Sequence, residues 1–273
     1  MSITNMLNAS IVLYCHSVAE IEPLVCSLRQ SELVKEVYLI DNSPKESEDF
    51  RELQAVYIFN NKNIGYGAAH NIAIRKTIEK NIPYHLVVNP DIQFSSSTLD
   101  ELVGYMVQNP EAGLLMPKVL YPNGQIQHLC KLLPKPSDLF FRRFLPPKWT
   151  QKSNERFELR KSGYDKIMEV PYLSGCFMLL RTEALKNVGM FDERFFMYPE
   201  DIDLTRRIHR KYKTIFYPNV SVVHHHARAS YQNVRLLAVH VWNLVRYFNK
   251  WGWFFDKERK KVNEFVLRKL DLL

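Results

Sequence analysis

Four short segments of this 273-residue chain carry side chains that could bind a charged ligand or move a proton. They are the glycine-containing segment 63–71 (NIGYGAAHN), the Asn-Pro-Asp segment 89–91, the acidic segment 191–203 and the histidines 224–226. The first could shape a ligand site, the second and fourth could bind a divalent cation, and the third could supply a general base. Each segment also has an ordinary structural explanation, and only their combination points to chemistry.

The glycine segment lies between a predicted strand at 55–60 and a predicted helix at 68–80, which is the context of the dinucleotide-binding G-x-G-x-x-G turn. Gly65 and Gly67 match this motif, but His70 stands at the place of its third glycine. The turn also follows the third predicted strand rather than the first. A tight turn whose glycines permit positive φ and close helix packing explains the pattern equally well.

Asn89 and Asp91 stand two residues apart at the end of the predicted strand 84–91. Mg²⁺ and Mn²⁺ prefer oxygen ligands and are often held by one or two carboxylates, while diphosphate oxygens and water complete the shell. Asp91 is therefore a candidate anchor for such a cation. The alternative is a plain turn, because Asn-Pro-Asp is common in turns.

The histidine run that ends the predicted strand 214–226 offers a second kind of ligand. Alternate side chains of a strand share a face, so His224 and His226 would point one way and His225 the other. Neutral imidazole is a common metal ligand and accepts Mn²⁺. Surface histidines at the end of a strand are the alternative interpretation.

The segment 191–203 holds five carboxylates, of which Glu200, Asp201 and Asp203 cluster at a predicted helix start. Acidic side chains favour the first turn of a helix, so capping explains part of this pattern. Neighbouring carboxylates also repel one another, which raises the pKa of one of them, as a general base requires. Glu200 and Asp201 are therefore candidate catalytic residues, and Arg207, one or two turns further on, could neutralise the cluster.

The elements that must position these residues alternate as in a parallel α/β sheet. Strands are predicted at 10–15, 37–42, 55–60 and 84–91, with helices at 18–30 and 68–80 between them. Ligands of such sheets bind at the carboxyl ends of the strands. The acidic and amide side chains that fall there are Asp41, Asn42, Asn63, Asn89 and Asp91.

The second half of the chain is less regular. From 131 to 163, proline, aromatic and charged residues form a stretch longer than ordinary connections, which predicts a functional lid or mobile loop. From Val234 onward the pattern indicates one or two helices rich in aromatic and basic residues. Such a tail suits an anionic membrane surface, but packing of its aromatic face on the domain is an equal alternative.

Composition narrows the class of protein. A hydrophobic content of 46% supports one large α/β domain with a modest appendage, and a formal net charge of +8 points to an anionic partner. Cys15, Cys26, Cys130 and Cys176 lack metal-site spacing and are expected to be reduced, mostly buried thiols. We find no signal peptide and no run of 18 apolar residues, so a cytoplasmic location is expected.

In order and spacing these segments resemble family 2 glycosyltransferases of the bacterial rhamnosyltransferase-like branch, from residue 10 to about 232. The matching pieces are SIVLYCHS, LIDNS, NIGYGAAHN, VVNPD, SGCFMLLR, GMFDERFFMYPEDIDL with Arg207 after it, and the strand ending in histidine. The resemblance implies the α/β fold named GT-A, which has a Rossmann-like, mostly parallel central sheet with helices on both faces. A C-terminal helical extension would follow it.

The resemblance also implies a division of the chain. Residues 1–235 would form the GT-A domain, with a nucleotide-sugar-binding half at 1–125 and an acceptor and catalytic half at 126–235. Residues 236–273 would form the aromatic and basic extension.

The resemblance further implies residue roles. The nucleotide-sugar donor would be bound by Leu13, Tyr14, Cys15, Asp41, Asn63, Gly65, Gly67, Asn89 and Asp91. Asp201 would be the catalytic base, with Glu200 as its neighbour or the less favoured alternative, and Gly175, Asp192 and Arg207 would position the acceptor or sugar.

By the same resemblance, a divalent cation, Mn²⁺ or Mg²⁺, would be held by Asp91 and one histidine. Counting from Pro218 selects His224, whereas counting back from Ser230 selects His225. Asn89 replaces the first acidic residue of the family's shortened D-x-D motif, which puts direct metal binding by Asn89 in doubt.

The implied activity is an inverting transfer of a sugar to a hydroxyl of a saccharide acceptor. The donor would be dTDP-rhamnose or a UDP-hexose, and the acceptor would be lipid-linked, as in bacterial O-antigen or capsule assembly. Peripheral contact with the inner face of the plasma membrane would follow, and no nucleic-acid partner is expected. The alternatives are a nucleotidyltransferase, although SIVLYCHSVAE lacks its glycine-rich basic loop, and a non-enzymatic nucleic-acid-binding module supported only by charge.

Overall fold

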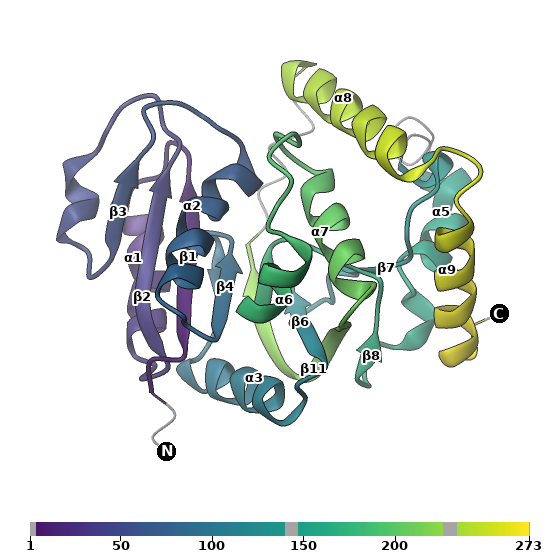
Figure 1. Ribbon diagram of the computed structural model, residues 1–273, viewed down its shortest axis with the longest axis horizontal. Coiled ribbons are helices and arrows are strands. Elements are labelled where there is room, and N and C mark those ends of the chain that lie inside the picture. The colour runs from purple at the N-terminus through teal and green to yellow at the C-terminus, as the bar shows by residue number, and fades with distance from the viewer. Residues whose placement is uncertain (1–3, 140–146, 226–233, 273) are drawn as a thin grey trace.

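The computed structural model describes residues 4–139, 147–225 and 234–272 (Figure 1). Nine strands in these ranges form one sheet: β1 (Leu7–Leu13), β2 (Val34–Asp41), β3 (Val56–Phe59), β4 (Tyr84–Val88), β5 (Ile92–Gln93), β6 (Ala112–Leu120), β8 (Met168–Glu169), β10 (Phe177–Arg181) and β11 (Lys213–His224). Their order is β3-β2-β1-β4-β10-β6-β11-β5, and β8 pairs with β11. Strands β1 to β4, β6 and β11 run in one direction, while β5, β8 and β10 run against them. The prediction of a mostly parallel sheet is confirmed.

Helices cover both faces of this sheet, as predicted. The side chains of α1 (Val18–Arg29) and α3 (Ser96–Gln108) share one core cluster with Leu86 and Leu179. The helices α2 (Tyr66–Glu79), α6 (Thr182–Val188) and α7 (Pro199–His209) contribute to a second cluster, together with Val87 and Leu180. Because neighbouring strand residues point to opposite faces, each central strand contributes to both cores.

Two small elements lie outside the helix layers and the main sheet. The strands β7 (Cys130–Lys131) and β9 (Tyr172–Leu173) form a two-stranded sheet, and a short 3₁₀ helix, η1 (Glu48–Glu52), precedes β3. The pairing of β7 with β9 places Lys131 opposite Tyr172. Through this pairing the segment after residue 129 is fixed beside the N-terminal end of α7, whose closest strand neighbour is β9.

The stretch 131–163, predicted as a lid or mobile loop, contains regular structure in the residues that the structure describes. This stretch contains the helix α5 (Pro147–Phe157) and the 3₁₀ helix η2 (Arg160–Ser162), and residues 140–146 lie outside the described ranges. Phe157 and Leu159 are buried in the second core, and the Leu132 N–H donates to the Phe157 carbonyl. Their apolar side chains anchor the stretch in the core. The many polar and proline residues around them gave no sequence pattern that indicates such packing.

The cysteines are free in the structure, but the expectation that most are buried is wrong for two of the four. Cys130 and Cys176 are buried, whereas Cys15 and Cys26 are exposed. Cys15 lies in the turn after β1 and has a φ of 58°, so its side chain points out of the core.

The C-terminal residues form two helices, α8 (Val234–Trp251) and α9 (Lys257–Lys269), which pack against the side of the domain that carries α7 (Figure 1). Tyr247 and Phe248 of α8 are fully buried in the second core together with residues of α7. Packing of the tail on the domain is therefore confirmed. No helix in the described ranges is long and apolar enough to cross a bilayer.

A buried ion cluster fastens this tail to α7. Arg206 is only 2% exposed, and its Nη1 and Nη2 lie 2.7 Å from Asp256 Oδ2 and 2.6 Å from Glu258 Oε2. The guanidinium also stacks over the Trp251 ring at 4.1 Å from the ring centroid. Asp256 additionally caps α9 by accepting from the Arg259 N–H. Charge, ring stacking and capping thus join α7, α8 and α9 into one unit.

Candidate active site

The carboxyl ends of β1 and β2 bring the first predicted residues together. Leu13 is opposite Asp41 in the sheet, and the carbonyl of Leu13 accepts from the Asn42 N–H at 2.9 Å. Asn42 Nδ2 then donates to Asn63 Oδ1 at 3.3 Å and to the Gly65 carbonyl at 3.2 Å. The strand-end convergence expected from the sequence is therefore present for these residues.

The carboxylate of Asp41 is buried and already oriented. Its Oδ1 accepts from the Ser43 N–H at 2.8 Å, and its Oδ2 accepts from the Tyr57 hydroxyl at 2.7 Å. Ser43 Oγ in turn accepts from the Cys15 N–H at 2.7 Å, while the Tyr14 side chain is half exposed. Tyr57 was not singled out in the sequence, because a tyrosine in a short strand carries no signal beyond its strand propensity.

Gly65 and Gly67 are both required by a close approach of the chain to itself. Gly65 has a φ of 94°, and a Cβ there would lie 2.5 Å from the carbonyl oxygen of Phe196. A Cβ on Gly67 would lie 2.8 Å from the Phe191 Cβ. The packing interpretation thus explains both glycines, and the segment that packs on them is the acidic segment 191–203. Asn71 adds two hydrogen bonds to the backbone of Phe191 and so also holds that segment.

Asp91 and His224 form a pair although 132 residues separate them. The last residues of β11 pair with β5, which places His224 opposite Ile92 and its Nε2 3.2 Å from Asp91 Oδ1. His225 is exposed, and its contact with this turn is a backbone N–H that donates to the Asp91 carbonyl. The geometry therefore selects His224 over His225, and His226 lies outside the described residues.

The pair has the donor chemistry of a divalent cation site. Burial opposes the charged form of His224, but hydrogen bonds to Asp91 and Cys176 outweigh it and raise the pKa to about 10. A cation would therefore compete with a proton for the imidazole. Among the described residues no group of three or more His, Cys, Asp or Glu side chains could hold a metal. One carboxylate and one imidazole fit Mn²⁺ or Mg²⁺ only if diphosphate oxygens and water complete the shell.

Glu200 and Asp201 lie at the N-terminal end of α7, and both are buried. Asp201 Oδ2 accepts from the Gly175 N–H at 3.0 Å, and its Oδ1 accepts from the Ile202 N–H at 2.7 Å. Burial raises the pKa of Asp201 to about 6, although Lys131 and these hydrogen bonds act in the opposite direction. Asp201 is therefore mostly ionised at neutral pH, as a general base must be.

Glu200 is in a different state from its neighbour. Burial, and secondarily the charge of Asp201, raises the pKa of Glu200 well above its usual range. Its Oε2 is buried, and the structure gives it no hydrogen-bond partner among the described residues. The two adjacent carboxyls thus have different surroundings: burial and the neighbouring charge favour the protonated form of Glu200, whereas two backbone hydrogen bonds favour the ionised form of Asp201.

Tyr66 and Gly175 connect the cation pair with the acidic pair. The Tyr66 hydroxyl lies 2.9 Å from Asn89 Oδ1 and 2.8 Å from the Gly175 carbonyl oxygen. The Asn89 N–H donates to the Cys176 carbonyl at 2.9 Å, and the Asn89 amide nitrogen lies 3.4 Å from His224 Nε2. The segment 175–176 thus touches Asp201 on one side and the cation pair on the other. The sequence did not identify Tyr66 as a site residue, because its contact with Gly175, 109 residues away, leaves no local pattern.

Arg207 and Asp192 lie near the acidic pair in the sequence but have partners outside it. Arg207 donates to Asp203 at 2.8 Å and to the carbonyls of residues 188–190, so it neutralises Asp203 and braces the preceding loop. Asp192 forms ion pairs with Arg194 and Lys250, and mainly the hydrogen bond from Arg194 lowers its pKa. The structure does not bring either residue into contact with Glu200 or Asp201.

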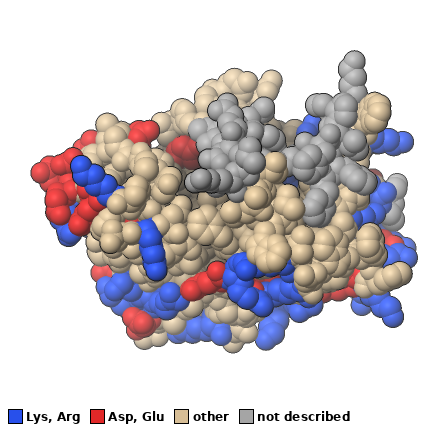
Figure 2. All heavy atoms as spheres, turned by 90° about the horizontal axis from the view of Figure 1, so that it is seen from above, with Lys and Arg blue, Asp and Glu red and all other residues tan. Residues whose placement is uncertain are grey.

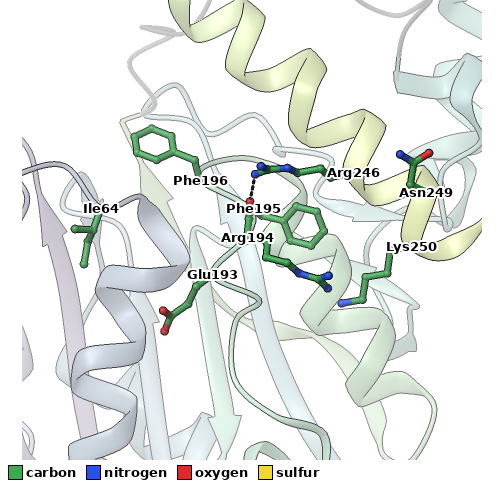
Figure 3. A pocket seen from close by; sticks show the side chains of 8 residues that line it. All are labelled: Ile64, Glu193, Arg194, Phe195, Phe196, Arg246, Asn249 and Lys250. Atoms are coloured by element: carbon green, nitrogen blue, oxygen red, sulfur yellow. Dashed lines mark hydrogen bonds between the residues drawn. The ribbon is translucent and has the colours of Figure 1, made fainter.

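A cavity of about 550 Å³ lies between the glycine segment, the residues before α7 and α8 (Figure 3). In Figure 3, Ile64 faces it from one side and Lys250 and Asn249 from the other, and Arg246 donates to the Arg194 carbonyl at 2.5 Å. Its lining residues are Ile64, Glu193, Arg194, Phe195, Phe196, Arg246, Asn249 and Lys250. The cavity offers apolar walls with cationic groups beside the acidic segment.

Figure 2 shows how the charged side chains are distributed on one face of the molecule. In Figure 2, Lys and Arg side chains occur along the lower rim and at the right end, while acidic side chains gather at the left end. On this visible face a few acidic side chains interrupt the basic ones of the lower rim, which favours recognition of a local anionic group over a long polyanion.

Comparison with known proteins gives a consistent family signal. The family model described as glycosyl transferase family 2 matches residues 10–189. An N-acetylglucosaminyl-diphospho-decaprenol L-rhamnosyltransferase of Mycobacterium tuberculosis is 31% identical over 177 residues, which are 62% of this chain and 58% of that protein. The low-salt glycan biosynthesis hexosyltransferase Agl10 of Haloferax volcanii is 26% identical over 185 residues, 65% of this chain and 54% of that protein. The chain thus spans under three fifths of these relatives.

Solved structures support the GT-A fold. The mannosyltransferase PcManGT from Pyrobaculum calidifontis, in complex with GDP-Man and Mn²⁺, superposes with a TM-score of 0.56 at 16% identity, covering 90% of this chain and 64% of that one. GalNAc-T7 with UDP, GalNAc and Mn²⁺ gives a TM-score of 0.57 at 12% identity, covering 82% and 44%. At these identities the likeness establishes the fold alone.

The raised pKa of Glu200 predicts a pH-dependent effect of Glu200→Gln on stability. Because the folded pKa is raised, the folded state keeps a proton that the unfolded state releases above its own pKa, so the wild type loses stability as the pH rises. Glutamine needs no such proton. The variant should gain up to about 1.4 kcal/mol per pH unit relative to the wild type above pH ~4.5.

Urea unfolding at pH 5, 6, 7 and 8 measures this difference. The exposed Glu52→Gln substitution is the matched control and should show a difference that does not change with pH. A Glu200→Gln difference that is equally flat would mean that Glu200 is ionised in the folded protein.

Proposed function

Because the chain belongs to glycosyl transferase family 2, and is therefore a glycosyltransferase, we propose that it transfers a sugar with inversion from a nucleoside-diphosphate donor to a hydroxyl of a saccharide acceptor. The family match leaves the nucleotidyltransferase and nucleic-acid-binding alternatives without support. One observation carries the proposal: the segment 175–176 joins an ionised buried carboxylate, Asp201, to the Asp91–His224 pair. A base and a diphosphate-binding cation site are what such a transfer needs.

Asp201 is the proposed base. In a single displacement the acceptor oxygen attacks the anomeric carbon opposite the departing diphosphate, and Asp201 removes the acceptor proton. The Gly175 and Ile202 N–H groups hold the two carboxylate oxygens in place, so the base is oriented before the acceptor arrives. Proton transfer to a positioned base contributes roughly 10²–10⁴ in rate. The protonated Glu200 beside it adds no competing negative charge.

Asp91 and His224 are the proposed ligands of Mn²⁺ or Mg²⁺, and Asn89 assists through its amide rather than as an anionic ligand. When bound there, the cation would neutralise the charge that develops on the leaving diphosphate. Asp91 Oδ1 and His224 Nε2 lie 3.2 Å apart, so one cation could contact both donors. Two proteins with this fold, PcManGT and GalNAc-T7, were solved in complex with Mn²⁺, which supports the proposal.

The donor nucleotide is proposed to bind at the ends of β1 and β2, against Leu13, Tyr14, Cys15 and Asp41. Asn63, Gly65 and Gly67 would shape the floor of this site, since their turn is fixed between Asn42 and Phe196. The proposed donor is dTDP-rhamnose, supported by the name of the mycobacterial relative, with a UDP-hexose as the second candidate.

The acceptor is proposed to enter from the cavity beside residues 193–196. Asp192, with Arg194 and Lys250 bound to it, borders this space, and Gly175 leaves room beside Asp201 because a Cβ there would lie 3.2 Å from the Asp201 Cβ. Arg207 would act indirectly, by bracing residues 188–190. A lipid-linked saccharide of bacterial surface polysaccharide assembly is the proposed acceptor, in line with the diphospho-decaprenol in the relative's name.

A lipid-linked acceptor requires contact with a membrane, and the tail offers a surface for it. Phe254 and Phe255, between α8 and α9, are 76% and 98% exposed, and the exposed Lys257 and Lys260 follow them. Adjacent exposed phenylalanines next to lysines suit insertion into an anionic headgroup region. We therefore place the enzyme at the inner face of the plasma membrane, as a peripheral protein.

Asp201→Asn should abolish sugar transfer while the donor binds nearly as well as to the wild type, because asparagine keeps the shape but cannot accept the proton. Transfer is measured with the donor that binds best, and donor affinity by calorimetry. The exposed Asp165→Asn is the matched control. Loss of donor binding together with transfer would refute the assignment of Asp201 as base. In the wild type, kcat/KM should fall as the pH decreases through about 6, where Asp201 takes up a proton.

Cation-dependent donor binding tests the proposed function directly. A thermal-shift panel of nucleoside diphosphates and their sugars with Mn²⁺, Mg²⁺ or EDTA should give a shift for one nucleotide that needs the cation, because a ligand of the native state stabilises it. Asp91→Ala should lose this shift. If no nucleotide shifts the wild type with any cation, the proposed function is wrong.

Membrane contact predicts that the double substitution Phe254→Ser and Phe255→Ser reduces co-sedimentation with vesicles rich in phosphatidylglycerol by at least severalfold, while melting temperature stays the same because both rings are in solvent. The matched control is Ile167→Ser, which removes another exposed apolar side chain. Equal sedimentation of the double variant and the wild type would contradict this surface.

A further inference from the structure

We propose that Gln127 is a positioning residue that fixes the orientation and the tautomer of His224, and so determines how tightly the enzyme binds its divalent cation. This inference rests on the proposed cation site at Asp91 and His224. It adds a residue that lies in neither β5 nor β11, the strands next to these two ligands. Gln127 is 5% exposed and lies seven residues after the end of β6, 97 residues before His224 in the chain.

Both ends of the Gln127 side chain are bound, and each end contacts His224. Gln127 Nε2 donates to the His224 carbonyl at 2.8 Å and lies 3.4 Å from the Leu120 carbonyl, while Gln127 Oε1 lies 2.9 Å from His224 Nδ1. The backbone of Gln127 is anchored as well, because its N–H donates to the Val119 carbonyl at 2.8 Å. One glutamine therefore holds both the backbone and the ring of the histidine.

The identity of these partners determines where the imidazole proton lies. A carbonyl oxygen only accepts hydrogen bonds, so the amide nitrogen of Gln127 must be the atom that faces the carbonyls of Leu120 and His224. Its Oε1 must then face the ring, and that oxygen also only accepts. His224 Nδ1 therefore carries a hydrogen and donates it to Gln127. In the neutral imidazole this leaves the lone pair on Nε2.

Nε2 is the atom that faces the proposed cation site. It lies 3.2 Å from Asp91 Oδ1 and 3.4 Å from the Asn89 amide nitrogen, and the His224 side chain is nearly inaccessible to solvent. Without an acceptor at Nδ1, the neutral ring could place its hydrogen on Nε2 and donate it to Asp91. That tautomer would block both metal donors at once. The hydrogen bond to Gln127 excludes it.

Hydrogen bonds of this kind, from the far nitrogen of a metal-binding histidine, typically change metal affinity or activity by about 10–100-fold. Most such partners are carboxylates or backbone carbonyls. A glutamine supplies the same acceptor without a negative charge, and its amide hydrogens fix the backbone of the histidine in addition. Gln127 thereby makes His224, and not the exposed His225, the histidine that is presented to the cation.

The experiment measures Mn²⁺ affinity directly, by electron paramagnetic resonance of free Mn²⁺ in the presence of the nucleoside diphosphate that binds best, rather than through activity. Gln127→Met keeps the size of the side chain and removes the acceptor, so it should weaken Mn²⁺ binding by roughly 10–100-fold. Gln127→Glu keeps the acceptor at Nδ1 and should retain Mn²⁺ affinity within severalfold of the wild type. Gln125→Met, at an exposed glutamine two residues away, should leave it unchanged.

Melting temperatures verify that each variant is folded, and Gln127→Asn, which withdraws the acceptor by one methylene, replaces Gln127→Met if the latter does not fold. Unchanged Mn²⁺ affinity in the folded Met or Asn variant would overturn the inference. Equal weakening in the Glu and Met variants would also overturn it, because a purely structural role would not distinguish them. A wild type that binds no Mn²⁺ with any nucleoside diphosphate would instead refute the cation site, and the inference with it.

Discussion

The hydrogen bond from the Gly175 N–H to Asp201 Oδ2 is the contact on which the rest of the site depends. Gly175 precedes β10, which pairs with β4 at the centre of the sheet, so this bond fixes a carboxylate on a helix to the strand frame. The same backbone segment carries the carbonyls that Tyr66 and the Asn89 N–H contact. A shift of α7 relative to β10 would therefore disturb both Asp201, the proposed base, and the turn that carries Asp91.

Contacts of Arg206 and Arg207, in the C-terminal half of α7, also fix the position of this helix. Arg206 contacts Asp256 and Glu258 beyond α8, and Arg207 contacts Asp203 and the carbonyls of residues 188–190. Removing one partner of a buried ion pair leaves an uncompensated charge, so these contacts make the tail part of the support of the site. Phe191 and Phe196, which precede α7 in the chain, pack closely against Gly67 and Gly65, where a larger residue would leave no room.

The site contains two pairs of ionisable side chains, one of two carboxyls and one of a carboxylate with a histidine. Glu200 and Asp201 lie side by side and are both buried. Burial raises the pKa of each carboxyl, and two backbone hydrogen bonds favour the ionised form of Asp201. Asp91 and His224 have opposite charges and stabilise one another, so that they form a compact pair until a cation competes for both. The proposed base and the proposed cation ligands thus belong to one polar network, in which the positive charge of His224 offsets that of Asp91.

Local periodicity and residue type suffice to predict the alternation of strands and helices, the acidic pair at a helix start and Asp91 at a strand end. The sequence by itself did not decide between His224 and His225, it did not show which carboxylate of the acidic cluster Arg207 would contact, and it gave no sign of Tyr57, Tyr66 or Gln127. Each of these depends on a partner far away in the chain: Gln127 meets His224 across 97 residues, and Tyr66 meets Gly175 across 109. Only the tertiary structure brings such partners within hydrogen-bond distance, since no local pattern encodes which loop will lie against which strand end.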